Sequence, residues 1–202
     1  MKIFGEMKIY DISQEIFSCN CFPGDPIPAF TRLSSTASGD LYNLTEFSMC
    51  AHNGTHVDAP FHFLQGGKTV DQLELSVFVG DCYVARHSGP VSAQQAWQIL
   101  DRAQGAERIL IAGEATVTEA AAEVFARSGI LLIGNESQTV GPENAPMQVH
   151  LTLLGHGIAL LEGVVLKGIP EGHYFLSAAP LNLAGSDGAP CRAYLIGPAS
   201  RK

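Results

Sequence analysis

The stretch RILIAGEATVTEAAAEVFARSGILLIGNES, which runs from Arg108 to Ser137, decides the fold class of this chain. Its two ends, RILIAGE and ILLIGNES, are short and almost continuously apolar, which is typical of strands that are buried on both faces. The segment between them repeats its apolar residues with helical period, can be capped by Thr116 or Thr118, and ends at Gly129. We therefore predict a strand, a helix and a second strand, joined by a right-handed parallel crossover.

Weaker signals on both sides extend this unit into a mixed α/β domain. Further strands are predicted at residues 8–13 and 158–166, and residues 173–196 are predicted to form strands joined by a glycine-rich loop. Helices are predicted at 91–107 and 145–157. The length of 202 residues suits one domain, and no linker or internal repeat divides it. We assign the domain to residues 7–202, because the Met-Lys-Ile that opens the chain recurs at residue 7 and leaves 1–6 as an upstream extension.

The composition excludes several classes of partner. The net charge is −8 and the pI is about 5.3, so the chain repels the phosphate backbone of nucleic acids. No apolar run approaches the length of a membrane span and the N-terminal residues lack the core of a signal peptide, so the cytoplasm is expected. Five cysteines, an odd number, argue against a disulfide framework. With 46% apolar and 16% charged residues, the domain is expected to have a large core or to bury further surface in an oligomer.

A second stretch, HNGTHVDAPFHF, spans His52 to Phe63 and is rich in metal-binding residue types. Its Asn-Gly and Ala-Pro pairs oppose helix, so an extended chain with a tight turn is predicted, in which residues of equal parity share a face. Four candidate ligands have equal parity: His52, His56, Asp58 and His62. Imidazole nitrogens and carboxylate oxygens are donors to Zn²⁺, Mn²⁺ and Fe²⁺. A group of surface histidines is the alternative, but the close spacing favours a metal site.

This stretch is also the place where the chain is similar to a known family. HNGTHVDAPFHF resembles the H-x-G-T-H-x-D-x-P-x-H motif of the cyclase-like metal-dependent hydrolases, which include bacterial kynurenine formamidases and isatin hydrolases. Residues 150–165 and 168–193 resemble two further signatures of that family, and FPGD at 22–25 resembles a loop that usually reads Trp-Pro-Gly-Asp. The resemblance extends from Met7 to Ile196. It implies a single swivelling β/β/α domain with a mixed sheet, usually in a homodimer or a higher assembly.

The resemblance further implies a site for one or two divalent ions per subunit, with Zn²⁺ favoured and Mn²⁺ or Fe²⁺ as alternatives. His52, His56 and Asp58 would hold the first ion. Asp58 would also contact the second ion, and His150 would complete that position. Glu162 would bridge the two ions.

The implied activity is arylformamidase-like hydrolysis of a small amide, N-formyl, lactam or lactone substrate, at carbon–nitrogen bonds other than peptide bonds. Metal-activated water would attack the carbonyl, with His62 as the acid and base. Phe22, in place of the family's tryptophan, would cover the substrate. Two other interpretations keep the same residues: a metal-dependent cyclase or lyase that adds no water, and a non-catalytic, metal-stabilised protein that binds a small metabolite.

Other features of the sequence give less specific signals. Glu136 could contact substrate or act as an additional acid, although a solvent-exposed carboxylate at a strand end is the commoner outcome. His156 lies between two glycines and is expected to bond carbonyl groups at a helix end. GSDGAP, residues 185–190, could bind an anion, but a tight turn is favoured. The loop after Glu114 is shorter than in kynurenine formamidases, and this difference is expected to border the substrate.

Overall fold

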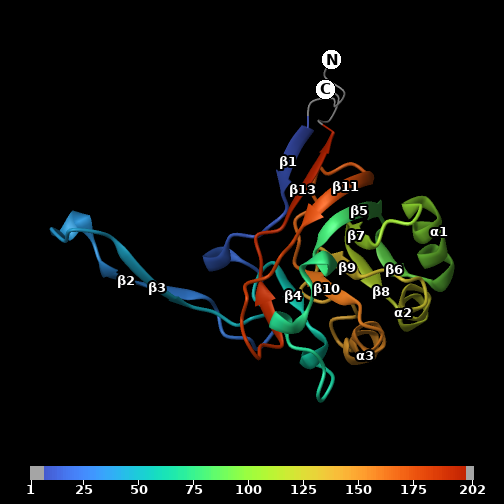
Figure 1. Ribbon diagram of the computed structural model, residues 1–202, viewed down its shortest axis with the longest axis horizontal. Helices are drawn as coiled ribbons and strands as arrows, with labels where there is room; N and C mark the ends of the chain where they lie inside the picture. The colour runs from blue at the N-terminus through green and yellow to red at the C-terminus, as the bar shows by residue number, and fades with distance from the viewer. Residues whose placement is uncertain (1–6, 199–202) are drawn as a thin grey trace.

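The computed structural model describes residues 7–198, and its framework is a nine-stranded mixed sheet (Figure 1). The strand order is β1-β13-β11-β5-β7-β9-β10-β4-β12. These strands are β1 (Met7–Asp11), β4 (His56–Asp58), β5 (Val79–Arg86), β7 (Arg108–Ala112), β9 (Leu132–Asn135), β10 (Ala159–Glu162), β11 (Gly172–Ser177), β12 (Gly188–Pro190) and β13 (Tyr194–Pro198). The described α-helices are α1 (Ala93–Ala103), α2 (Glu119–Ala126) and α3 (Met147–Gly155). The predicted α/β class with a mixed sheet is confirmed, whereas the extension proposed for 1–6 lies outside the described residues.

The stretch from 108 to 137 forms the centre of this sheet. β7 and β9 are parallel, with Arg108 opposite Leu132, and α2 lies between them in the chain. The Thr118 hydroxyl caps α2 by accepting a hydrogen bond from the backbone N–H of Ala121. The predicted strand, helix and parallel strand are therefore confirmed. β5 and β10 continue the parallel pairing on the two sides of this unit.

Alternate residues of β7 belong to two separate hydrophobic cores. Ile109 and Ile111 pack in a core with Phe125 of α2, on the side that the helices cover (Figure 1). Leu110 packs instead in a core with Leu195 of β13. Because side chains alternate along a strand, burial of both faces explains why this sequence is continuously apolar. Each large aliphatic side chain that is fully buried stabilises the fold by about 1.5–3 kcal/mol.

Residues 29–48 form an arm that extends away from the body of the molecule (Figure 1). The arm consists of β2 (Ala29–Ser34) and β3 (Leu44–Ser48), which pair antiparallel with each other and with no other described strand. Its apolar side chains are exposed, most of all at the tip, where Leu41 is 97% and Tyr42 is 60% exposed. Neither the arm nor its exposure was predicted from the sequence.

Several details refine the other predictions. β6 (Gly89–Val91) and β8 (Ala115–Val117) form an additional parallel pair. The strand expected at 158–166 ends at Glu162, because Gly163 adopts a left-handed φ of 66° and turns the chain. All five cysteines are free. In the described part of the chain no helix is long and apolar enough to cross a membrane, and the cytoplasmic location stays a prediction.

Candidate metal centre

Strand β4 places two candidate ligands in the interior of the protein. It lies between β10 and β12 and is antiparallel to both, with His56 opposite Glu162 of β10. His56 and Asp58 are each 1% exposed, and residues two apart in a strand lie on the same face. The pairing of β4 with β10 therefore brings a third candidate ligand, Glu162, beside them.

The turn before β4 fixes the orientation of the His56 ring. Gly54 has a φ of 64°, and a Cβ at this position would come within 3.0 Å of the Cys19 Cβ, so the turn requires glycine. His56 Nδ1 donates a hydrogen bond of 3.0 Å to the Gly54 carbonyl. This bond directs His56 Nε2 at Asp58 and Glu162, whose nearest oxygens are each 3.4 Å away.

Helix α3 contributes His150 in the same way. His150 Nδ1 donates to the Pro146 carbonyl at 2.9 Å, so Nε2 points at the carboxylates, 3.2 Å from Glu162 Oε1 and 3.6 Å from Asp58 Oδ2. The backbone N–H of Val140 donates to Glu162 Oε1 at 2.7 Å and holds that carboxylate in place. Each of the two histidines is thus oriented by a backbone carbonyl on the side opposite to the cluster.

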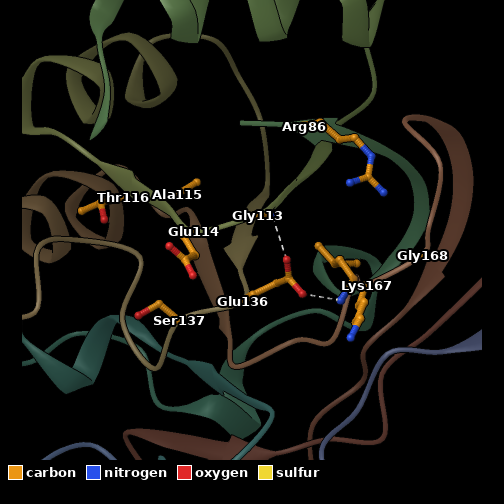
Figure 2. Close-up of a pocket in the computed structure, with 10 residues that line it drawn as sticks. Arg86, Gly113, Glu114, Ala115, Thr116, Glu136, Ser137, Lys167 and Gly168 are labelled. Carbon is orange, nitrogen blue, oxygen red and sulfur yellow. Dashed lines mark hydrogen bonds between the residues drawn. The ribbon is translucent and has the colours of Figure 1, made fainter. Parts of the chain in front are cut away.

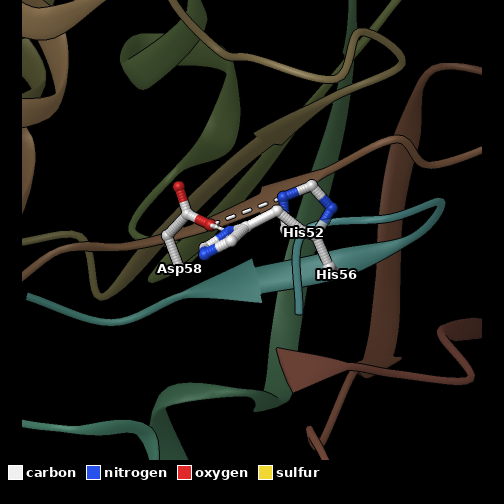
Figure 3. Close-up of side chains that lie close together, drawn as sticks. All are labelled: His52, His56 and Asp58. Atoms are coloured by element: carbon white, nitrogen blue, oxygen red, sulfur yellow. Dashed lines mark hydrogen bonds and ion pairs between the residues drawn. The ribbon is translucent and has the colours of Figure 1, made fainter. Parts of the chain in front are cut away.

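His52 and His62 reach the cluster from outside the strand, although the sequence pattern placed them on one extended face with His56. His52 lies in the turn before β4, and its Nδ1 is 2.8 Å from Asp58 Oδ1 (Figure 3). His62 ends a 3-10 helix, Pro60–His62, and its ring lies 4.0 Å from that of His52, centroid to centroid.

Asp187 joins these two histidines and was not predicted from the sequence. Its Oδ2 accepts hydrogen bonds from His52 Nε2 at 2.8 Å and from His62 Nδ1 at 3.2 Å. The residue lies within GSDGAP, and the next residue, Gly188, has no room for a Cβ because this atom would come within 2.7 Å of His52 Cε1. The tight turn predicted for this segment accounts for its glycines but assigns no role to the carboxylate of Asp187.

A cavity of about 250 Å³ opens onto the cluster. Phe22, His62 and Phe63 line it together with four of the candidate ligands, His52, His56, His150 and Glu162. His62 Nε2 lies 4.0 Å from Asp58 Oδ2, at the border between the cavity and the buried groups. The cavity therefore brings the predicted acid and base and the predicted aromatic cover, Phe22, to the predicted metal ligands.

The charges of the cluster are strongly coupled. Burial alone would lower the pKa of His56 and of His150, but the carboxylates of Asp58 and Glu162 outweigh it and raise each pKa to about 10. Burial alone would raise the pKa of Asp58, but the surrounding histidines hold it well below its usual range. For His62, burial outweighs the attraction of Asp58 and lowers the pKa, which keeps this imidazole neutral at pH 7.

The donor set fits a divalent metal ion. Asp58 Oδ2 is buried and accepts no hydrogen bond from the described residues, since even His150 Nε2 stays 3.6 Å away. A metal ion would satisfy this oxygen. Within residues 7–198, ligand atoms within 4.8 Å of one another occur in three groups: His52, His56 and Asp58; Asp58, His150 and Glu162; and His52, His62 and Asp187. The groups share residues, so they form one continuous centre of nitrogen and oxygen donors suited to Zn²⁺, Mn²⁺ or Fe²⁺.

Glu136 and His156 lie outside this centre and have structural contacts. Glu136 Oε2 accepts from the N–H of Gly113 at 2.7 Å and Oε1 from the N–H of Leu166 at 2.8 Å, on one wall of a separate cavity (Figure 2). It therefore joins the segments that follow β7 and β10. His156 Nδ1 donates to the Thr152 carbonyl at 2.8 Å, as expected for a residue at a helix end.

The fold and the site together define a class: an α/β protein whose mixed sheet carries a buried cluster of histidines and carboxylates. Residues 10–129 match the family model described as "Putative cyclase". The chain is 32% identical to the kynurenine formamidase of Erythrobacter litoralis (strain HTCC2594), with 94% of each chain covered. It is 35% identical to that of Geobacillus thermodenitrificans (strain NG80-2), with 92% of this chain and 95% of the relative covered. The chain therefore belongs to the cyclase family.

Solved structures agree with this assignment. "The Structure Of Potential Metal-Dependent Hydrolase With Cyclase Activity" superimposes with a TM-score of 0.81 at 26% identity, over 98% of this chain and 100% of the other. Isatin hydrolase A from Labrenzia aggregata has a TM-score of 0.82 at 19% identity, over 96% of this chain and 94% of the other, and so shares the fold. The family and the cyclase-like fold predicted from the motifs are confirmed.

Proposed function

We propose that this protein is a metal-dependent hydrolase of a small amide, N-formyl compound, lactam or lactone, with arylformamidase-like cleavage of a carbon–nitrogen bond as its principal reaction. One observation carries the proposal: the imidazole of His62 borders a cavity that opens onto a cluster of three histidines and two carboxylates. The full-length similarity to kynurenine formamidases supports this class of reaction.

The metal would be held by His52, His56, Asp58, His150 and Glu162, as one or two ions, with Zn²⁺ favoured and Mn²⁺ or Fe²⁺ as alternatives. When bound, such an ion supplies a Lewis acid for the scissile carbonyl and lowers the pKa of water towards neutrality. Glu162 is suited to contact two ions, because Oε1 lies beside His150 Nε2 and Oε2 beside His56 Nε2, at 3.2 and 3.4 Å.

His62 is positioned to move the proton. Its Nδ1 donates to the Asp187 carboxylate, which leaves Nε2 as the basic nitrogen. His62 lines the cavity, and there Nε2 would take a proton from the attacking water and return it to the leaving nitrogen. Phe22 would cover the apolar part of the substrate and exclude water from it.

The test begins with metal analysis of protein purified without added metal. An assay panel of N-formylkynurenine, isatin, lactones and cyclic imides follows. We expect at least one compound to be converted, with products that together exceed the substrate by the mass of one water. Conversion without gain of water would indicate a cyclase or lyase, and ligand binding without any turnover would indicate a binding protein; each result contradicts the proposal.

The arm supports a proposal about assembly, a homodimer or a higher homo-oligomer. A two-stranded hairpin is marginally stable in water by itself, and this one exposes Phe30, Leu33, Leu44 and Phe47 in addition to its tip. Contiguous exposed apolar side chains of this kind mark interaction surfaces in soluble proteins. A second copy of the chain is the partner that this surface fits.

A further inference from the structure

A second cavity, of about 300 Å³, adjoins the one that opens onto the metal cluster. The two cavities share three residues, Phe22, Gln138 and Thr139, which therefore form the ridge between them. Glu136 and Glu143 are among the residues that line the outer cavity. A molecule whose reactive group lies at the metal cluster would place its other end across this ridge.

The outer cavity is acidic. Glu143 is exposed and has no hydrogen-bond or ion-pair partner among the described residues, and Glu136 accepts hydrogen bonds from two backbone N–H groups. No lysine or arginine within residues 7–198 lines either cavity. Arg86 and Lys167 line a different cavity, which Glu136 also borders (Figure 2). A cationic group would be attracted to the outer cavity, whereas a carboxylate there would have no basic side chain to pair with.

Unpaired polar atoms on the ridge point independently to a ligand. Thr139 is 3% exposed, and its hydroxyl oxygen has no hydrogen-bond partner in the described part of the chain. The amide nitrogen and oxygen of Gln138 are buried and equally unpaired. Buried polar groups are almost always hydrogen-bonded in native proteins, so three such atoms between two cavities indicate that a bound molecule completes them.

We propose that the outer cavity is the subsite for a protonated amine of the substrate, so that this enzyme acts on amides that carry an ammonium group and no carboxylate. The inference rests on the proposed hydrolase function. Glu143 and Glu136 hold the ammonium, and Gln138 and Thr139 bond the polar atoms between it and the scissile amide. The amide itself lies in the inner cavity beside His62.

The test compares two substrates that differ by one group, N-formylkynurenine and N-formylkynuramine, which keeps the ammonium and lacks the α-carboxylate. We expect kcat/KM of the metal-loaded enzyme to be at least about tenfold higher for N-formylkynuramine. Glu143→Gln should raise KM for this compound about fivefold or more with little change in kcat. The control Glu114→Gln, an exposed glutamate that lines only the separate cavity, should leave both constants unchanged.

Preference for N-formylkynurenine, or a KM that Glu143→Gln does not change, would overturn the inference and leave the hydrolase assignment intact. If neither compound is hydrolysed, calorimetric titration with kynuramine and kynurenine decides. If kynuramine binds and Glu143→Gln weakens this binding, the subsite proposal stands although the proposed formamidase reaction does not. Equal binding of the two compounds, or binding of neither, would overturn the subsite as well.

Discussion

The cluster of histidines and carboxylates and the arm differ in the kind of side chain that each one buries or exposes. In the cluster, ionisable residues are almost completely inaccessible: His56 and Asp58 are 1% exposed and Glu162 is 2% exposed. In the arm, apolar residues face solvent, with Leu41 97% and Phe30 54% exposed. Each arrangement is costly for an isolated chain, because buried charges need compensation and exposed apolar surface favours association.

Both regions lack a binding partner within the chain, and the chemistry of the missing partner differs between them. The cluster has the geometry of a rigid site, since backbone carbonyls orient two of its histidines and a backbone N–H holds one carboxylate. The arm has strand pairing, and the described ring contacts to the rest of the molecule are those of Phe30 and Phe47 with Phe17. A small cation matches the first region, and a large apolar surface matches the second. Both assignments can be tested separately.

The largest effect is expected from removal of the charge at the centre of the cluster. Asp58→Asn preserves shape but removes the carboxylate that lies within 4 Å of four histidines. We expect metal content to fall to background and hydrolysis to drop at least about 10³-fold, since the ion contributes several kcal/mol to the reaction. Elemental analysis and a turnover assay measure this. Asp101→Asn, on α1, is the control, and full metal content in Asp58→Asn would disprove the assigned ligand set.

A smaller loss of activity is expected from substitution of His62, at the edge of the same cluster. His62→Ala should retain the metal and lose activity by about 10²- to 10⁴-fold, the usual contribution of a general acid and base. The half-buried His87, which bonds a backbone carbonyl elsewhere, provides the control His87→Ala. Loss of metal together with activity would instead make His62 a ligand, as its place in a group with His52 and Asp187 allows.

Local pattern predicted the cluster only in part. The alternation of His56 and Asp58 along one strand is a local property, and the motif resemblance supplied His150 and Glu162. Asp187 was missed because its contact with His52 spans 135 positions, and nothing in a glycine-rich turn indicates which strand it will approach. Asp187 follows from the pairing of β12 with β4, which only the folded chain defines.

The arm was missed for the opposite reason. An apolar pattern can predict a strand but not what covers it, so the exposure of Phe30, Leu33, Leu44 and Phe47 was not predicted. The central β7 and β9 were predicted well because continuous apolar runs and a capped helix between them allow few other arrangements. Sequence patterns therefore predicted the strands and helix that pack against one another within a short stretch of the chain. They missed Asp187 and the arm, whose contacts depend on residues far away in the sequence or on another molecule.

The arm provides the next test. The double substitution Leu41→Ser with Tyr42→Ser removes two tip side chains that the chain itself leaves exposed, so the fold of the monomer should be unaffected. If they are buried in a dimer, each contributes about 1.5–3 kcal/mol, and dissociation should become about 10²-fold easier or more. Sedimentation equilibrium across a dilution series measures this change. Trp97→Ser removes an equally exposed aromatic from α1 and should leave the assembly unchanged; dissociation by this variant alone would place the interface at the helices.

The smallest effect is expected where a carboxylate already has its partners within the chain. Glu171 accepts hydrogen bonds from the Tyr83 hydroxyl at 2.8 Å and the Arg86 N–H at 2.9 Å. Burial opposes its ionisation, but these contacts outweigh burial and lower its pKa below the usual 4.5. Its stabilisation is therefore complete above about pH 4.5 and is lost as the pH falls through the lowered pKa.

Glu171→Gln should cost about 0.5–1.5 kcal/mol in the free energy of unfolding at pH 7, the net value of a hydrogen bond. The difference from the parent chain should narrow in acid, because protonation weakens the same contacts in the parent. Urea unfolding at pH 7 and pH 3.5, at one protein concentration, measures both values, with Glu123→Gln on the exposed face of α2 as the control. A difference that widens in acid would contradict this account. Glu171 has its hydrogen-bond partners within the same chain. Its stabilising effect should therefore not depend on a metal ion or a second copy, unlike the proposed roles of the cluster and the arm.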